Sequence, residues 1–431
     1  MYALKSFVQI GFATLCLAGM WLHVDRVVVG HQVSEAARLG TPRGNLSDLY
    51  PVWYGSRELL LHQRNPYSPE VTREIQAGYY GRPIEQARPN DPTNEQAFAY
   101  PAYTAFLLAP TVKLPFPVVR VVFFWLLMML TAASVLLWMK AIAWKLACPQ
   151  IAVTLLLTFG SFQVVQGLKL QQLSLLVAFF VALAFIALSR GRLLAAGVLL
   201  GLAMIKPQLA CPVSVWLTLW AASRFRERWR FAAGLIGCCI LLAVGAEFLL
   251  PGWIRKFAEA IIAYRRYAAG GRLLDQMLPA AIAVPLLACL LAGVAVACWR
   301  VRKLDANDEA FKLISALVLA FTLLIPPMYP PHYQLLLLPG VFLLVRDAKP
   351  LNIVFRFLLV LAAGMMVWSW LLAIILAATS FFTLRAQQYW DAPLWTTVVF
   401  PIPLIGCLGL MTYKKVYAAR ASRSLGQGMP Q

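Results

Sequence analysis

The stretch RGRLLAAGVLLGLAMIKPQ, residues 190–208, decides the fold class. Its apolar run lies between two arginines at one end and Lys206-Pro207 at the other, which is typical of a helix that crosses a membrane. Apolar runs of about 17 or more residues recur along the chain, each long enough to cross about 30 Å of hydrocarbon. Of the 431 residues, 61% are hydrophobic and 13% are charged, against about 25% charged in soluble domains. The sequence therefore predicts an all-α polytopic membrane protein, with residues 1–431 as a single integral membrane domain.

The basic residues gather in short clusters between the apolar runs, and the positive-inside rule places these clusters in the cytoplasm. They are Arg190 and Arg192; Arg224, Arg226, Arg228 and Arg230; Arg300, Arg302 and Lys303; Arg346 and Lys349; and Lys414, Lys415, Arg420 and Arg423. This scattering explains the formal charge of +20 without a nucleic-acid partner. About twelve transmembrane helices satisfy the rule, with a cytoplasmic basic tail at 413–431. The predicted spans are 6–23, 117–139, 150–166, 172–189, 193–206, 208–223, 231–250, 277–299, 310–327, 333–346, 352–378 and 395–412.

The first external loop, residues 24–116, is too long for a simple connection and should have its own structure. Apolar residues at helical spacing predict one amphipathic juxtamembrane helix lying on the membrane. These residues are Leu49, Val52, Trp53, Leu59 and Leu60. The segment PEVTREIQAGYY, 69–80, predicts a second helix, with Pro69 near its start and Gly78 near its end. Residues 101–114 are apolar but short and interrupted by proline, which indicates a re-entrant or interfacial segment.

Asp48 stands at the head of the first of these helices, within the stretch NLSDLYPVWYGSRELLLHQRNPY, 45–67. One interpretation is a helix N-cap, because aspartate is a preferred capping residue. The other is a general base, because a carboxylate at an apolar boundary beside Tyr50, Trp53 and Tyr54 can accept a proton from a substrate hydroxyl. The two roles are compatible.

Lys206 is an ionisable residue between two apolar runs, so it must be paired, snorkel or face an aqueous cavity. Pro207 breaks the helix there and leaves backbone groups free. A fixed cation in such a place suits a phosphate, although a structural ion pair remains open. His332 follows a run of prolines and could face the same cavity or be a structural histidine. The basic external loop 251–276 could hold an anionic lipid head group or be a solvated helix.

Four stretches of the chain, in this order and spacing, carry a family resemblance. They are Asp48-Leu49 with Tyr54 and Asn65-Pro66-Tyr67; FAYPAY at 98–103; LQQLSLL at 170–176; and the stretch 190–208. Over about residues 45–230 the chain resembles the polyprenol-phosphate-mannose-dependent mannosyltransferases of glycosyltransferase family 87, which have the GT-C fold. The chain departs from the family's motifs at Ala102, Gln171 and Ser174.

The resemblance implies a GT-C-like bundle in the bacterial inner membrane, with the active site facing the periplasm. It implies transfer of a sugar, with mannose expected, from a polyprenyl-phosphate donor to a lipid or glycan acceptor, with inversion at the anomeric carbon. Asp48 carries over as the general base. Lys206 and His332 are the expected ligands of the donor phosphate. The expected substrate-binding residues are Tyr54, Tyr100, Gln172 and Gln208.

No cofactor is expected, and a metal is not expected because no second acidic ligand accompanies Asp48 in the sequence, although Glu58 or Asp91 could fold close. Membrane lipids are expected partners, and the sequence leaves the oligomeric state open. A transporter or flippase of a lipid-linked or anionic substrate is the main alternative, because it would also explain Lys206 and the broken helix. A polysaccharide polymerase or ligase, which would use a diphosphate-linked donor, is another.

Overall fold

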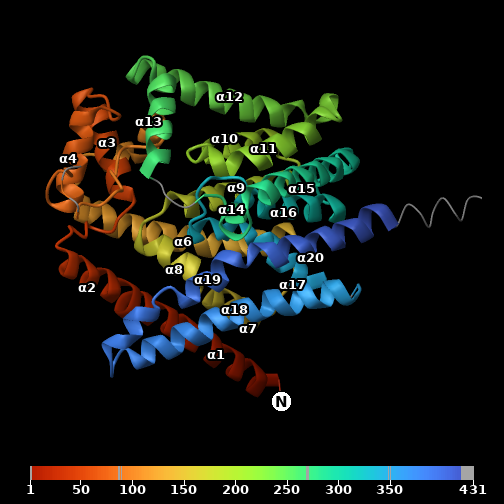
Figure 1. The fold of residues 1–431 in the computed structure, drawn as a ribbon. Coiled ribbons are helices and arrows are strands. Elements are labelled where there is room, and N and C mark those ends of the chain that lie inside the picture. The colour runs from red at the N-terminus through yellow and green to blue at the C-terminus, as the bar shows by residue number, and fades with distance from the viewer. Residues whose placement is uncertain are drawn as a thin grey trace, which may run out of the picture.

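The computed structural model describes residues 2–85, 88, 90–267, 271–347, 349 and 351–418, and these form helices and no strand (Figure 1). The α-helices of the first half are α1 (Tyr2–Leu22), α2 (Val29–Leu39), α3 (Leu49–His62), α4 (Pro69–Tyr80), α5 (Thr104–Leu108), α6 (Phe116–Ala141), α7 (Cys148–Phe159), α8 (Phe162–Lys169), α9 (Leu173–Ser189), α10 (Leu193–Ala203) and α11 (Pro207–Ala222). Those of the second half are α12 (Phe225–Leu249), α13 (Trp253–Tyr267), α14 (Leu273–Met277), α15 (Ala280–Val301), α16 (Glu309–Phe321), α17 (Leu338–Asp347), α18 (Ile353–Thr379), α19 (Ala392–Val399) and α20 (Pro401–Tyr413).

Within the described part of the chain, six helical stretches are long and apolar enough to cross a membrane. They are Lys5–Leu39, Phe116–Ala141, Phe225–Leu249, Ala280–Val301, Ile353–Thr379 and Leu384–Val416. The bent pair of α7 and α8 would be a seventh. The protein is therefore a polytopic helical membrane protein. The predicted count of twelve spans is not confirmed, because several helices that fall within the predicted spans, such as α10, are shorter than a full span. The predicted basic tail lies outside the described residues from position 419 onwards, including Arg420 and Arg423.

The predicted span 150–166 is wrong as a single helix, because α7 and α8 meet at an angle of 62°. The break lies at Gly160, where an added Cβ would come within 2.7 Å of the Cα of Leu17 in α1. Two indoles bind the carbonyls that the break frees. Trp370 donates to the Gly160 carbonyl at 2.9 Å and Trp21 to the Phe159 carbonyl at 3.1 Å. The bend is thus stabilised by hydrogen bonds to the exposed backbone groups.

The start of the predicted loop 24–116 is also helical. Helix α1 continues through the π-helical turn η1 (His23–Val28) into α2, so the first helical stretch reaches Leu39. Helix α4 has the predicted bounds 69–80, and the Ser68 hydroxyl caps it by accepting from the Val71 N–H at 3.3 Å. Gly78 does not end this helix. An added Cβ there would lie 1.7 Å from the hydroxyl of Tyr50, so Gly78 lets α4 pack closely on α3.

The apolar stripe of α3 packs against protein, which contradicts the prediction that it faces the membrane surface. Leu49, Val52, Trp53 and Leu59 are buried. The ring of Trp53 lies 5.2 Å from that of Phe116 at the start of α6. A stripe with helical period shows that one face avoids water, and here neighbouring helices cover it.

The segment 101–114 forms α5 and a short 3₁₀ turn, η2 (Ala109–Thr111). At about 1.5 Å per residue, a helix of this length cannot cross the membrane. Its buried residues Ala102 and Ala105 pack with Leu59 of α3 and with Trp253 of α13. The outer segments α3, α4, α5 and α13 lie together at one end of the bundle, on the left in Figure 1.

Helix α10 is held against α12 by close backbone contact. An added Cβ on Gly197 would lie 2.2 Å from the Phe231 carbonyl oxygen, and one on Gly234 would lie 2.3 Å from the Leu194 carbonyl oxygen. Small residues that let helix backbones approach are a common packing device in membranes. This seam fixes α10, and Lys206 follows directly after it.

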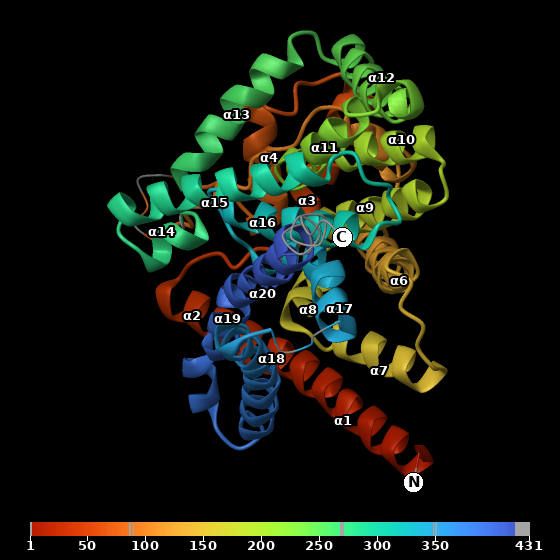
Figure 2. The same ribbon diagram turned by 90° about the vertical axis from the view of Figure 1, so that its right-hand side faces the viewer.

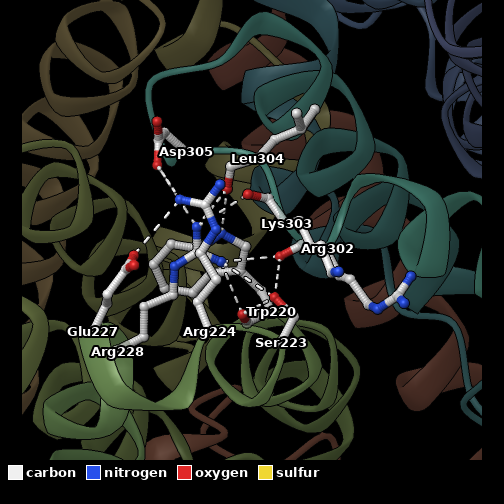
Figure 3. A network of polar contacts seen from close by, with 9 residues as sticks. All are labelled: Trp220, Ser223, Arg224, Glu227, Arg228, Arg302, Lys303, Leu304 and Asp305. Carbon is white, nitrogen blue, oxygen red and sulfur yellow. Dashed lines mark hydrogen bonds and ion pairs between the residues drawn. The ribbon is translucent and has the colours of Figure 1, made fainter.

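At the other end of the bundle, buried Arg228 joins three chain segments (Figure 3). Its guanidinium donates to the carbonyls of Trp220, Arg302 and Leu304, each at 2.9 Å. The same group stacks over the Trp220 ring, 4.0 Å from the centroid. Arg228 therefore binds carbonyls at or just beyond the C-terminal ends of α11 and α15, which have no partners within those helices. Figure 2 shows the two helices side by side.

We expect Arg228→Met to lower the free energy of unfolding by about 3 kcal/mol, because it leaves several buried carbonyls without a donor. Chemical denaturation in detergent measures this. Arg226→Gln is the matched control, since Arg226 is exposed on the same helix and its loss should change stability by less than about 0.5 kcal/mol. Equal stability of the two variants would contradict the structural role of Arg228.

Candidate functional site

Asp48 occupies the N-cap position of α3, but its side chain does not cap the helix. Its carboxylate instead accepts a hydrogen bond from the side-chain amide of Gln172, and the residue is half-buried. The capping interpretation of Asp48 is therefore wrong for the side chain. The carboxylate is held by a residue far away in the sequence.

The loop before α3 is fixed on the turn between α8 and α9. The Asp48 N–H donates to the Leu170 carbonyl at 3.0 Å. The Ser47 hydroxyl donates to the side-chain oxygen of Gln171 at 2.6 Å, and both residues are buried. Gln171 has a φ of 51°, the left-handed region that a tight turn requires. These contacts set the position of Asp48 relative to Gln172.

Gln172 connects Asp48 to Lys206. Its amide nitrogen donates to the Asp48 carboxylate, and its amide oxygen accepts from the Lys206 ammonium at 2.7 Å. Both Gln172 and Lys206 are buried. Only this orientation of the amide satisfies both neighbours, because the carboxylate accepts and the ammonium donates. The predicted base and the predicted phosphate ligand therefore belong to one continuous chain of hydrogen bonds.

All three residues of this chain are N-cap residues. Asp48 precedes α3, Gln172 precedes α9 and Lys206 precedes α11, and none of the three side chains caps its own helix. A helix N-terminus carries unpaired N–H groups and a partial positive charge. Three such ends and one ammonium give this region a positive field that favours an anion.

Lys206 lies between two aromatic rings. Its ammonium nitrogen is 5.5 Å from the ring centroid of Tyr100 and 5.4 Å from that of Tyr333. An ammonium has three N–H donors, and Gln172 takes the one hydrogen bond that it makes to described residues. The exposed side chain of Gln208 donates to the Tyr333 hydroxyl at 3.3 Å and so touches the same cluster.

Burial raises the pKa of the Asp48 carboxyl, and the hydrogen bond from Gln172 and the positive charge of Lys206 oppose this shift. The net result is a pKa above the ordinary value of an aspartate. A raised pKa makes a carboxylate a stronger base, which suits proton abstraction.

A group of tyrosines surrounds the carboxylate, and sequence reasoning did not assign most of them to the site. Burial raises the pKa values of Tyr79, Tyr80, Tyr100 and Tyr264, and the negative charge of Asp48 adds to the effect in each. The pKa of Tyr264 rises to about 12. Tyr264 comes from α13 in the basic loop 251–276. The one sequence signal was the mixture of tyrosines and basic residues in that loop.

Of two further predicted residues, Tyr54 lies in other surroundings and His332 lies beside Tyr333 of the Lys206 cluster. The Tyr54 hydroxyl donates to Glu74 at 3.0 Å, and Glu74 is also paired with Arg64 at 2.7 Å. Tyr54 thus belongs to an ionic network between α3 and α4. His332 is buried beside Tyr333, with its ring centroid 5.1 Å from the tyrosine ring, and its Nδ1 has no partner among the described residues.

A mostly apolar cavity begins two residues beyond His332. It contains about 1090 Å³ of space, part of it open to the outside. Its lining includes Gln334 of the 3₁₀ turn η4 (Pro331–Leu337) and Leu338 and Val345 of α17. Phe162 and Met366 also line it. Asp48 and Lys206 are not among its lining residues.

The acidic residues considered as companions of Asp48 are engaged elsewhere. Glu58 pairs with Arg64 at 2.8 Å, and Asp91 pairs with Arg82. Among the described residues, no group of three or more histidine, cysteine or acidic side chains could hold a metal ion.

Part of the sequence that forms this site matches the model of a known protein family. The model of glycosyltransferase family 87 matches residues 98–327, more than half of the chain. The chain belongs to glycosyltransferase family 87. It is therefore a glycosyltransferase, as the resemblance predicted. No curated protein and no solved structure matched.

The matched region of this glycosyltransferase differs from the stretch 45–230 that carried the resemblance in sequence. It contains Tyr100, Gln172, Lys206 and Gln208 and leaves out Asp48, whose connection to the site comes from the hydrogen bond to Gln172. It ends before His332.

The hydrogen bonds of Gln172 to Asp48 and Lys206, which we call the bridge, predict that substitutions at Gln172 and Lys206 have coupled effects on stability. Gln172→Leu and Lys206→Met should each destabilise the glycosyltransferase, but the double variant should be less destabilised than the sum, by about 1 kcal/mol, because the two residues share one hydrogen bond. The free energies of unfolding in detergent of the wild type, the two single variants and the double variant form the double-mutant cycle that measures this coupling. Gln172→Leu combined with Arg228→Met is the control, and this distant pair should be additive. Additivity in both pairs would contradict the bridge.

Proposed function

We propose that this glycosyltransferase transfers a sugar, mannose by family resemblance, from a polyprenyl-phosphate donor to the hydroxyl of a lipid or glycan acceptor. The observation that carries the proposal is the chain Asp48–Gln172–Lys206, because it joins a base to a phosphate-binding cation. We infer a GT-C-like bundle of about twelve spans in the bacterial inner membrane, with the site facing the periplasm. The positive-inside rule supports this orientation.

In the proposed reaction Asp48 is the general base. Its carboxylate takes the proton of the acceptor hydroxyl, whose oxygen attacks the anomeric carbon from the side opposite the phosphate. The bond from the anomeric carbon to the phosphate oxygen breaks, and the lipid phosphate leaves with the electron pair. A single displacement of this kind inverts the anomeric configuration. The raised pKa of Asp48 supports the role, because it increases the basicity of the carboxylate.

Lys206 is the proposed ligand of the donor phosphate. Gln172 takes one of its three N–H donors, and the others face the neighbouring rings, where a phosphate oxygen can accept them. The negative charge on the phosphate grows as the sugar leaves, so a fixed cation stabilises the transition state more than the ground state. His332 is proposed as a second phosphate ligand, since its Nδ1 is buried without a partner among the described residues.

The apolar cavity is proposed to hold the polyprenyl chain. It starts near His332 and follows α17 towards Val345, so a lipid phosphate at Lys206 would have an apolar path for its tail. Such a site needs no nucleotide-binding domain, because the donor sugar is carried on the lipid.

Tyrosine and amide groups are proposed to bind the sugar and the acceptor. Tyr100, Gln172 and Gln208 all contact the Lys206 cluster, and Tyr264 offers a further hydroxyl near Asp48. The hydroxyl of Tyr54, the other predicted substrate ligand, donates to Glu74.

A transporter or flippase of a lipid-linked or anionic substrate is the alternative activity. The buried lysine and the broken helices would suit it too. The detergent-solubilised protein separates the two, since an enzyme needs no second compartment and turns over in a micelle. Parallel assays with monophosphate-linked and diphosphate-linked donors distinguish this proposal from a polymerase or ligase.

We expect Asp48→Asn to lower transfer from a polyprenyl-phosphate sugar by about 10²–10⁴-fold, because it removes the base. The measurement is turnover of labelled donor by purified protein in detergent. Asp391→Asn is the matched control, since Asp391 lies in another external loop, where its carboxylate accepts from the Trp395 indole, and it should keep normal turnover. Unchanged turnover in Asp48→Asn would overturn the assignment.

The pH dependence of the transfer rate should report the protonation of the Asp48 carboxyl group. Only the carboxylate form is a base, so kcat/KM should fall as the pH drops through its raised pKa. The acidic limb should therefore lie above about 4, the ordinary value for aspartate. Lys206→Met removes a positive charge that lowers this pKa, and should move the limb to higher pH. Lys169→Met, a lysine paired with Asp25 in the same outer region, should leave the limb in place. A limb that stays fixed in Lys206→Met would argue against Asp48 as the titrating base.

A further inference from the structure

A second cavity lies at the end of the bundle away from α3 and α4. It opens between the ends of α16, α17 and α20, where the chain approaches its C-terminal tail (Figure 1). It contains about 1380 Å³ of space, part of it open to the outside. Its charged lining residues are Glu309, Arg346, Asp347, Lys349, Lys414 and Lys415. We refer to it as the lysine cavity.

The carboxylates of the lysine cavity are neutralised within the protein. Glu309 is paired with Lys312 at 2.8 Å and also with Arg346. Asp347 accepts two hydrogen bonds from Arg346, at 2.8 and 2.6 Å. Arg346 also donates to the carbonyl of Ile142. Its guanidinium is therefore committed to holding the ends of α6, α16 and α17 together.

Three lysines remain without such partners. Lys349, Lys414 and Lys415 are exposed and make no ion pair with any residue in the described ranges. They line one cavity although they come from two separate segments. Three ammonium groups around one hollow, with the acids already paired, leave an excess of positive charge that an anion would relieve.

The remaining walls of the cavity are apolar. Met411 lies on α20, one turn before Lys414, and Leu351 lies between α17 and α18. Both side chains are partly exposed, and the buried side chain of Leu343 also lines this side. An apolar wall next to a cluster of lysines matches the boundary between the acyl chains and the head group of a lipid. A free phosphate would use the lysines alone.

We propose that the lysine cavity binds the head group of an anionic phospholipid. The phosphate would receive hydrogen bonds from the lysine ammonium groups, and the part of the acyl chains next to the head group would contact Leu351 and Met411. This site lies apart from the Asp48 chain, so it does not depend on the proposed transfer reaction. Its occupancy would fasten the ends of α17 and α20 to the membrane surface.

The test uses the purified full chain in detergent, titrated with phosphatidylglycerol and, in parallel, with phosphatidylcholine, and bound lipid is counted by native mass spectrometry. Lysines near anionic head groups contribute roughly fivefold each. We therefore expect the combined variant Lys349→Gln, Lys414→Gln and Lys415→Gln to bind phosphatidylglycerol about 100-fold more weakly. Binding of phosphatidylcholine should not change.

The combined variant Arg190→Gln, Arg192→Gln and Lys303→Gln is the matched control. It removes three exposed charges from other basic clusters that do not line the cavity, and it should retain phosphatidylglycerol. An equal loss in both variants would overturn the proposal, and so would unchanged binding in the lysine variant. Inorganic phosphate that binds as tightly as the lipid would also overturn it, because the apolar wall would then contribute nothing. Turnover of a sugar donor is not used as a readout, so the proposed transfer reaction can fail while this proposal stands.

Discussion

The amide of Gln172 is the contact on which the arrangement of the site depends. In a direct ion pair, the Asp48 carboxylate and the Lys206 ammonium would be in contact. The contact would lower the basicity of the carboxylate and use N–H donors of the ammonium. The amide holds the two charges one side chain apart and satisfies one atom of each. The carboxylate and the ammonium therefore keep free capacity for hydrogen bonds. This separation suits the proposed roles of Asp48 as a base and of Lys206 as a phosphate ligand, because the two groups do not neutralise each other.

Charges in buried surroundings need compensation, and the backbone supplies part of it. Asp48, Gln172 and Lys206 all precede helices, so the site sits where the chain is interrupted three times. Helix interruptions at membrane depth are tolerated where protein buries the freed backbone groups. The Tyr103 hydroxyl, for example, donates to the Met204 carbonyl at 2.8 Å beside the break before Lys206. The polar site and the broken helices are thus consequences of each other.

The sequence predicted the parts of this site that stand out chemically. Asp48 and Lys206 are charges in apolar surroundings, and a charge there needs a reason. The sequence did not predict that the Asp48 side chain leaves its own helix uncapped. Capping propensity is a local property, whereas Gln172, the donor that binds the carboxylate instead, lies far along the chain. Tyr264 could not be foreseen, since its place depends on how α13 crosses the outer segments. The period of the α3 stripe was clear, but a period cannot distinguish a lipid neighbour from a protein one. The bend at Gly160 was hidden for a similar reason, because the apolar pattern continues through it.

Arginine and lysine side chains are used in different ways in this bundle. Arg228 and Arg346 are buried or nearly so, and the surrounding carbonyls and carboxylates take most of their donors. They hold helix ends together and have little capacity left for a ligand. Lys206 and the three lysines of the second cavity use few of their donors on protein. Guanidinium groups suit fixed, multidentate contacts, whereas an ammonium on a flexible stem can exchange partners. The use of arginine for structural contacts and of lysine at the two proposed sites therefore follows from how many directed donors each group must commit.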